Sequence, residues 1–110
     1  MVERAKPVIT SEFYERHFSE ILQHSISAFG VTQTEKYFEM IAKLVENLNV
    51  FYTYHPECRH LATKNRIYRN IILDAHLIIY RITEERVEVL DIIHSASSIR
   101  KIRATKGIKI

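Results

Sequence analysis

The chain has 110 residues, 46% of them hydrophobic, with 2 Gly, 2 Pro and a single cysteine, Cys58. These values predict one compact domain over residues 1–110, because the apolar residues suffice for one core and so few Gly and Pro leave little room for a disordered linker. No apolar run approaches the roughly 20 residues that span a bilayer, and the charged start MVERAKPVIT lacks the apolar stretch of a secretory signal. One cysteine also excludes an internal disulfide, so we expect a cytoplasmic protein.

The formal net charge of +3 is unevenly distributed along the chain. Residues 1–50 carry 5 Lys/Arg against 7 Asp/Glu, whereas residues 51–110 carry 11 against 6. No acidic residue follows Asp91, and the basic C-terminal segment 95–110 contains Arg100, Lys101, Arg103, Lys106 and Lys109. This imbalance favours an acidic partner, either nucleic acid or an acidic protein segment, although a short basic tail also serves solubility alone.

The first half of the chain predicts a strand and two helices. PVIT (residues 7–10) has the composition of a short strand, and apolar residues at helical spacing then run from Tyr14 to Phe29. Thr10 or Ser11 can cap this helix, and Gly30 stands where a left-handed C-terminal cap belongs.

The second helix follows directly after Gly30. TQTE (residues 32–35) is typical of a capping box, and an apolar stripe extends from Tyr37 to Leu48. The short connection predicts an antiparallel helical hairpin, and we interpret both stripes as core.

The second half predicts a β-meander. A turn-rich connection, residues 50–65, leads to three strands at 66–73, 76–82 and 87–94, rich in β-branched residues and joined by short turns. The middle strand is apolar on nearly both faces and is expected to be central, covered by helices on at least one side. The segment after His94 fits a short helix, a last strand or a mobile tail. The order β-α-α-β-β-β indicates an α+β fold in which the antiparallel helical hairpin packs on a small antiparallel sheet.

No motif for a metal or a cofactor stands out. Two glycines cannot build a Gly-rich phosphate loop. His55, Cys58 and His60 are close in sequence, but a zinc site needs a complete ligand set at defined geometry, and a nucleophilic cysteine needs an activating base. We interpret these three as loop residues beside a proline, and we expect neither a metal nor a cofactor.

Two other patterns are candidates for binding. Arg66, Tyr68 and Arg69 alternate basic and aromatic character, and residues 66 and 68 would share a strand face able to hold phosphate and stack a base. In the alternative interpretation Tyr68 packs inward and the arginines face water. His76 and His94 frame the hairpin HLIIYRITEERVEVLDIIH, and we expect each to lie at a strand end, His76 as a surface residue and His94 as a structural residue or a target contact.

The element order, the HP turn after the second helix, and the run YRNIILDAHLIIYRITEERVEVLDIIHSASSIRKI together resemble the RelE/ParE superfamily of bacterial toxins, which includes plasmid stabilisation proteins. The resemblance covers about residues 6–103. It implies the toxin of a type II toxin–antitoxin module, with growth arrest as its effect and a cognate antitoxin as its partner.

The superfamily has two functional classes, and Leu77 bears on the choice between them. RelE-like members cut mRNA on the ribosome with an arginine three residues before a strand tyrosine; here that tyrosine resembles Tyr80, and Leu77 occupies the arginine position. RelE-like members also carry a late Tyr or His, whereas none follows His94. The chain therefore resembles the ParE-like class, which inhibits DNA gyrase by protein contact. Arg69, Arg81 or His94 would have to serve as catalytic substitutes in an mRNA endoribonuclease, and a non-toxic binding module of the same fold is the remaining alternative.

The resemblance also implies how partners bind. The antitoxin would contribute a flexible acidic or amphipathic C-terminal segment, which docks on the helical hairpin and the adjacent sheet edge. The candidate residues for contact with antitoxin or target are Arg66, Tyr68, Arg69, His94, Arg100, Lys101 and Arg103.

Overall fold

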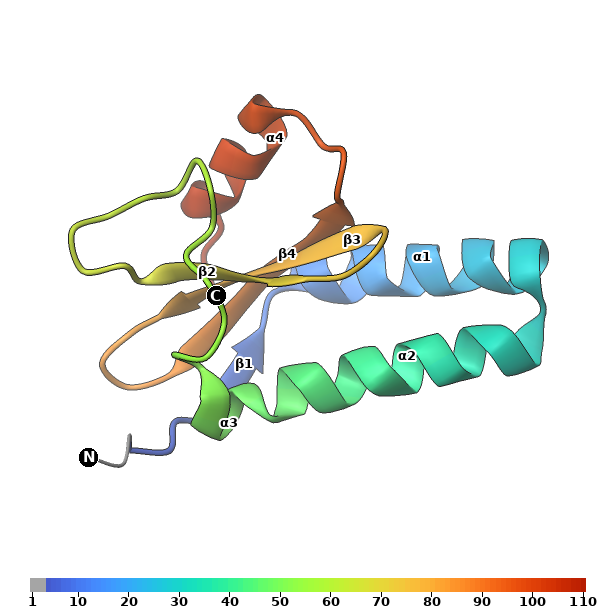
Figure 1. Cartoon of the computed structure of the whole chain (residues 1–110), viewed down its shortest axis with the longest axis horizontal. Helices are drawn as coiled ribbons and strands as arrows, with labels where there is room; N and C mark the ends of the chain where they lie inside the picture. The colour runs from blue at the N-terminus through green and yellow to red at the C-terminus, as the bar shows by residue number, and fades with distance from the viewer. Residues whose placement is uncertain (1–3) are drawn as a thin grey trace.

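The computed structural model describes residues 4–110 and confirms the α+β fold. The elements follow in the order β1 (Val8–Thr10), α1 (Glu12–Phe29), α2 (Val31–Glu46), α3 (Leu48–Phe51), β2 (Tyr68–Ile72), β3 (His76–Ile82), β4 (Val87–His94) and α4 (Ile99–Ala104), with a short 3-10 turn at Thr105–Gly107. The α1–α2 hairpin and α4 lie on opposite sides of the sheet (Figure 1). The first three residues of the predicted charged start lie outside the described residues.

The start of α1 is fixed by Ser11, one of the two predicted caps. Its hydroxyl accepts a hydrogen bond from the Tyr14 backbone N–H at 3.0 Å and donates its own proton in a hydrogen bond to the Leu90 carbonyl. Ser11 is buried, and its backbone N–H also donates to the Val89 carbonyl at 2.9 Å. This residue therefore both begins the helix and holds it to β4.

Gly30 alone separates α1 from α2. Its φ of 84° and ψ of 167° lie in a region that is essentially restricted to glycine, so the predicted left-handed cap is wrong: φ is positive, but ψ lies outside the left-handed helical conformation. Gly30 ends α1 and is also the N-cap of α2, which begins at Val31 without a side-chain cap. The predicted capping box at Thr32 and Glu35 is therefore wrong, because both residues already lie inside the helix.

The sheet order is β1-β4-β3-β2. β2, β3 and β4 form the predicted antiparallel meander with β3 inside the sheet, but β1 pairs with β4 in parallel, Val8 opposite Val87, so the expectation of a wholly antiparallel sheet is corrected at this edge. β2 begins at Tyr68 rather than at residue 66, because Arg66 has a φ of 56° that an extended strand cannot continue.

A bulge interrupts the β3–β4 ladder. Tyr80 pairs with Val89 and Ile79 with Asp91, so Leu90 has no partner of its own in the register. Beyond the bulge the pairing is displaced by one residue, and this displacement sets the far end of the hairpin, where His76 stands opposite His94.

Two apolar clusters cover the two sheet faces. The first, under the helical hairpin, includes Phe38, Ile41, Ile78, Tyr80 and Ile92. The second, under α4 and the 56–67 connection, includes Cys58, Tyr68, Ile79, Ile93 and Ile102. The central strands thus have covered faces, as their apolar sequences predicted. Within residues 4–110, no helix combines the length and the apolar character needed to cross a membrane.

Candidate binding site

The β3–β4 hairpin has two ends of different character, which we call the open end, at His76 and His94, and the closed end, at the Thr83–Arg86 turn. At the open end the two histidine rings meet edge to face with centroids 6.0 Å apart. The Tyr37 hydroxyl lies 3.1 Å from His76 Nδ1. Burial and the neighbouring His94 lower the pKa of His76, and a neutral His76 can accept a hydrogen bond from the Tyr37 hydroxyl at Nδ1.

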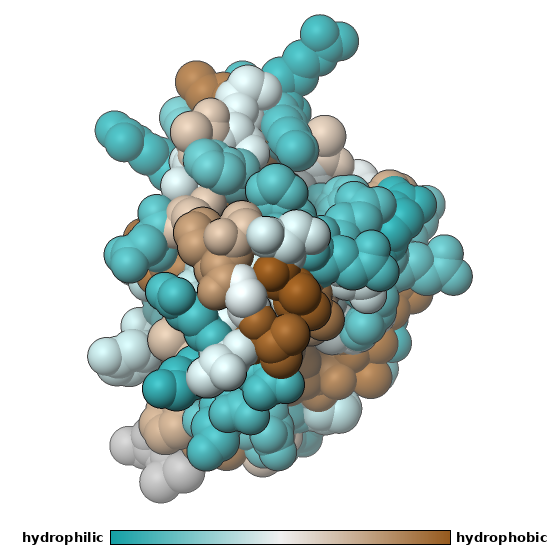
Figure 2. Space-filling view, turned by 90° about the vertical axis from the view of Figure 1, so that its right-hand side faces the viewer, coloured by the Kyte–Doolittle hydropathy of each residue, from teal (hydrophilic) through white to brown (hydrophobic). Residues whose placement is uncertain are grey.

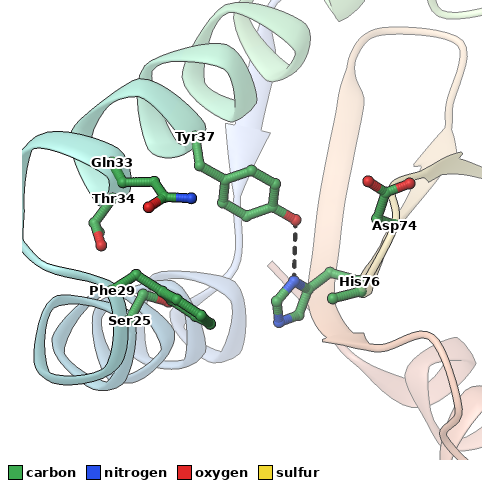
Figure 3. A pocket seen from close by; sticks show the side chains of 8 residues that line it. Ser25, Phe29, Gln33, Thr34, Tyr37, Asp74 and His76 are labelled. Atoms are coloured by element: carbon green, nitrogen blue, oxygen red, sulfur yellow. Dashed lines mark hydrogen bonds between the residues drawn. The ribbon is translucent and has the colours of Figure 1, made fainter.

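A cavity of about 350 Å³ adjoins His76 at the tip of the helical hairpin, and we call it the tip cavity. It is lined by Ser25 and Phe29 of α1, Gln33, Thr34 and Tyr37 of α2, and Asp74, Ala75 and His76 around the start of β3. Figure 3 shows Phe29 and Tyr37 on opposite sides of this space, with Gln33 and Thr34 at one end and His76 at the other. The cavity therefore presents aromatic walls with polar groups at both ends.

Thr34 is the most unusual residue of the tip cavity. It is 3% exposed, and its Oγ1 has no hydrogen-bond partner among residues 4–110. A helical threonine hydroxyl commonly donates to the carbonyl four residues before it, beside the backbone N–H that this carbonyl already accepts; here the Gly30 carbonyl accepts the Thr34 backbone N–H at 3.3 Å but no bond from Thr34 Oγ1. An unpaired buried hydroxyl is costly, so a molecule that enters the cavity and bonds Thr34 gains an interaction that the free chain lacks.

A second cleft of about 300 Å³, the edge cleft, shares His76 with the tip cavity. Its lining comprises His17, Glu20 and Ile21 of α1, His76, Ile92, Ile93 and His94 of the sheet, and Lys101 of α4. His17 Nδ1 lies 2.6 Å from Asp91 Oδ1, and that carboxylate oxygen also accepts the Ile92 backbone N–H at 2.8 Å. The edge cleft thus adds exposed nitrogen groups beside the largely apolar tip cavity.

The three candidates around β2 do not form a common binding face. Arg66 is exposed and lies 3.8 Å from the Glu57 carboxylate, whereas Tyr68 is 6% exposed and packs in the second cluster. Arg69 donates through Nη1 to the carbonyls of Thr53 and His55 at 2.9 and 3.0 Å. The expectation that residues 66 and 68 share a strand face is wrong because Arg66 precedes the strand, and the inward alternative for Tyr68 holds.

Arg81, a candidate catalytic substitute, belongs to an ion-pair network near the closed end. Its Nη2 lies 2.6 Å from Glu88 Oε1, while Arg86 Nη2 lies 2.7 Å from Glu88 Oε2. Arg81 also donates to the Ile108 carbonyl at 3.1 Å, which ties the C-terminal segment to the sheet. Burial by itself would raise the pKa of Glu88, but the hydrogen bonds from the two arginines hold it below its ordinary value.

The basic C-terminal segment forms α4, one of its three predicted states. The Ser98 hydroxyl accepts the Lys101 backbone N–H at 3.2 Å and begins the helix, while Ile102 is buried against the sheet. Arg100, Lys101 and Arg103 are exposed. The helix therefore fixes an apolar side on the fold and presents its cations to solvent, with Lys101 facing the edge cleft.

The loop residues considered for metal or nucleophilic chemistry are built into the structure. Cys58 is buried, and burial raises the pKa of its thiol to about 11. His55 packs against the Tyr80 ring at 6.2 Å, and burial lowers its pKa. Among residues 4–110, no three His, Cys, Asp or Glu side chains are grouped so that they could hold a metal ion.

Sequence reasoning missed four residues of the site. His17 and Asp91 are 74 positions apart, and no local pattern predicts their contact. Thr34 was interpreted only as part of a capping box, and Tyr37 only as core. The available signal for Thr34 was its spacing, three and four residues before Tyr37 and Phe38, which puts a polar residue on the apolar face of the helix, where it needs a partner.

The geometry defines a class of protein: a small α+β domain whose surface features at the open end suit binding. The family model described as the ParE toxin of type II toxin-antitoxin system, parDE, matches residues 9–99. The chain therefore belongs to the ParE toxin family, which confirms the resemblance and its ParE-like side. A solved structure described as the chromosomal ParDE TA system from P. aeruginosa has a TM-score of 0.68 at 14% identity, covering 84% of this chain and 98% of that one, and so supports the fold. The comparison with curated proteins found no match.

Proposed function

We propose that this chain arrests bacterial growth by protein contact with DNA gyrase and that a cognate antitoxin neutralises it in a hetero-oligomer. Membership in the ParE toxin family supports a type II toxin module. The observation that favours contact over RNA cleavage is Leu77, which stands where RNA-cutting relatives have arginine. Leu77 packs beside Ile79 and Ile93 in the second apolar cluster, where an aliphatic side chain offers nothing to a scissile phosphate.

Arg69 and Arg81, considered as substitutes for the catalytic arginine of RNA-cutting relatives, are both engaged elsewhere in the fold, which supports the same proposal. Arg69 bonds backbone carbonyls, and Arg81 is paired with Glu88 and the C-terminal segment. An arginine that already neutralises a buried carboxylate is poorly available to a transition state, because leaving Glu88 unpaired would be costly. Of the candidate contact residues predicted from the sequence, those that are exposed and available to a partner are His94, Arg66 and the three α4 cations Arg100, Lys101 and Arg103.

The gyrase proposal is tested by adding the purified chain to gyrase and relaxed plasmid, and by inducing the chain in bacteria. We expect inhibited supercoiling and a DNA-damage response while mRNA stays intact. Rapid codon-specific cleavage of mRNA, with supercoiling unaffected, would contradict the proposal and assign the RelE-like activity instead. Absence of both effects would leave a non-toxic binding module.

The antitoxin part of the proposal rests on charge. The α4 cations complement an acidic segment and would speed its association. Reversal of charge at Arg100, Lys101 and Arg103 should weaken binding of the cognate antitoxin and reduce the salt dependence of its affinity. The matched control reverses Arg59 and Lys64, two exposed cations of the 56–67 connection. Equal affinity of the two variants would make α4 a solubility feature.

A further inference from the structure

We propose that the tip cavity receives a tyrosine side chain of the antitoxin and that an acidic residue next to this tyrosine occupies the edge cleft. This inference rests on the proposed antitoxin partnership and adds the chemistry of the residue that anchors it. The carrying observation is Thr34, a residue that lines a cavity between the Phe29 and Tyr37 rings and whose buried hydroxyl has no partner among residues 4–110.

The cavity suits a phenol. A volume of about 350 Å³ admits one aromatic side chain, and Phe29 and Tyr37 provide apolar walls on its two sides. A phenolic hydroxyl can both donate and accept, so it can pair with Thr34 Oγ1 whichever way that hydroxyl turns. Phenylalanine would fill the same space but leave Thr34 unpaired. A buried site that bonds a ligand hydroxyl rejects the analogue without that hydroxyl more strongly than a purely apolar site can.

The surroundings indicate a protein partner. Phe29 is 64% exposed and Val31 54% exposed on either side of Gly30, so the apolar surface continues beyond the cavity around the tip. Figure 2 looks onto this end of the molecule and shows apolar side chains gathered there among polar ones. Apolar surface that extends past a pocket is typical of an interface with a peptide, which covers the rim as well as the interior.

Charge indicates which kind of residue lies beside the anchor. The edge cleft begins at His76, where the tip cavity ends, and carries Lys101 with His94 and His17. The Asp91 carboxylate already holds His17 Nδ1, so Lys101 and His94 are the donor groups at this cleft that would meet an incoming carboxylate, against the opposing charge of Glu20, which also lines it. A segment with tyrosine and an adjacent acidic residue is thus complementary to both hollows.

The direct test uses N-acetyl-tyrosinamide and N-acetyl-phenylalaninamide as probes, titrated into the full chain and followed by NMR. We expect both to shift the amide signals of Thr34, Tyr37 and His76, with the tyrosine probe binding about fivefold more tightly, the worth of one hydrogen bond. Thr34→Val should abolish this difference while keeping the weaker binding, and Phe29→Ala should weaken both probes. Equal affinity of the two probes for the unaltered chain would overturn the proposal.

The matched control is Thr105→Val, which alters a buried threonine whose hydroxyl donates to the Ile102 carbonyl, away from the cavity. It should leave the ratio of probe affinities unchanged. A change as large as that of Thr34→Val would show a general effect on the fold and contradict a specific contact.

The antitoxin itself then separates this inference from the proposed function. If the antitoxin binds and Thr34→Val weakens it about fivefold, both stand. If the antitoxin binds all variants equally, the anchor is overturned and the partnership stands. If no antitoxin binds although the probes occupy the cavity, the partnership and its anchor both fail. Self-association that Thr34→Val removes would make a second copy of the chain the occupant and would overturn the antitoxin assignment.

Discussion

The closed and open ends of the β3–β4 hairpin treat polar groups in opposite ways. Near the closed end the buried Glu88 carboxylate meets two arginines, and Arg81 continues to the backbone of the C-terminal segment. At the open end the buried Thr34 hydroxyl has no partner within residues 4–110, and His76 stands between two hollows. A buried polar group that the fold pairs stabilises the fold, whereas one left unpaired beside a cavity is costly, and Thr34 is for this reason the residue at which we propose that a partner binds.

The largest expected effect on stability comes from breaking the closed end. Glu88→Gln should lower the free energy of unfolding by about 3 kcal/mol, because two guanidinium groups lose their shared carboxylate. Urea unfolding measures this loss. Glu84→Gln, in the exposed part of the same turn, is the control and should change stability little. A small effect at Glu88 would show that the network is not what stabilises this end.

The next effect concerns the helix connection that shapes the open end. Gly30→Ala should destabilise by about 2 kcal/mol, because the φ of 84° and ψ of 167° strain any residue with a Cβ. Space is not the cause, since a Cβ at Gly30 meets nothing within 4 Å. Gly107→Ala has the same free space without a positive φ, so its thermal midpoint should match that of the unaltered chain.

Thr34→Val is expected to change stability in the opposite direction, because it removes a polar group that has no partner among residues 4–110. Removal of an unpaired buried hydroxyl should stabilise the chain by about 1 kcal/mol, with little change in shape. Thr105→Val removes a hydroxyl that is bonded to the Ile102 carbonyl and should destabilise instead. Chemical unfolding of the two variants decides the point; destabilisation by both would indicate that Thr34 is satisfied in solution.

The smallest expected effect is the pH dependence of the open end. The pKa of His76 is lowered in the fold, so the unfolded chain binds its proton more readily, and stability should fall as pH drops through the ordinary histidine value near 6.5. The free energy of unfolding should therefore fall less between pH 7.5 and 5.5 in His76→Gln than in the unaltered chain, by a difference of less than about 1 kcal/mol. His24→Gln, on the exposed side of α1, should keep the slope of the unaltered chain. An unchanged slope in His76→Gln would assign the dependence to another group.

Local sequence patterns predicted the elements well because those elements depend on near neighbours. β3 and β4 were predicted at residues 76–82 and 87–94, as observed, since β-branched runs bounded by a charged turn leave few alternatives. Where the pattern failed, a neighbouring element prevailed: the Thr32–Glu35 pattern had the right spacing, but the single-residue turn at Gly30 moved the helix start ahead of it.

The site was less predictable because its contacts join distant parts of the chain. Lys101 reaches the edge cleft only because Ile102 buries the other side of α4 against the sheet. Likewise, Tyr37 becomes a site residue only where its hydroxyl meets His76, 39 positions away. Neither relation has a local signature.

The α+β order, the helical hairpin and the ParE-like family all follow from the amino-acid sequence alone, because each depends on residue type and spacing along the chain. The tertiary structure decided the pairing of His76 with His94. A regular ladder continued from the Ile82–Val87 pair would set Ile93 opposite His76, and it is the bulge at Leu90 that brings His94 there. Side chains in a strand alternate between faces, so a displacement of one residue determines which side chains meet.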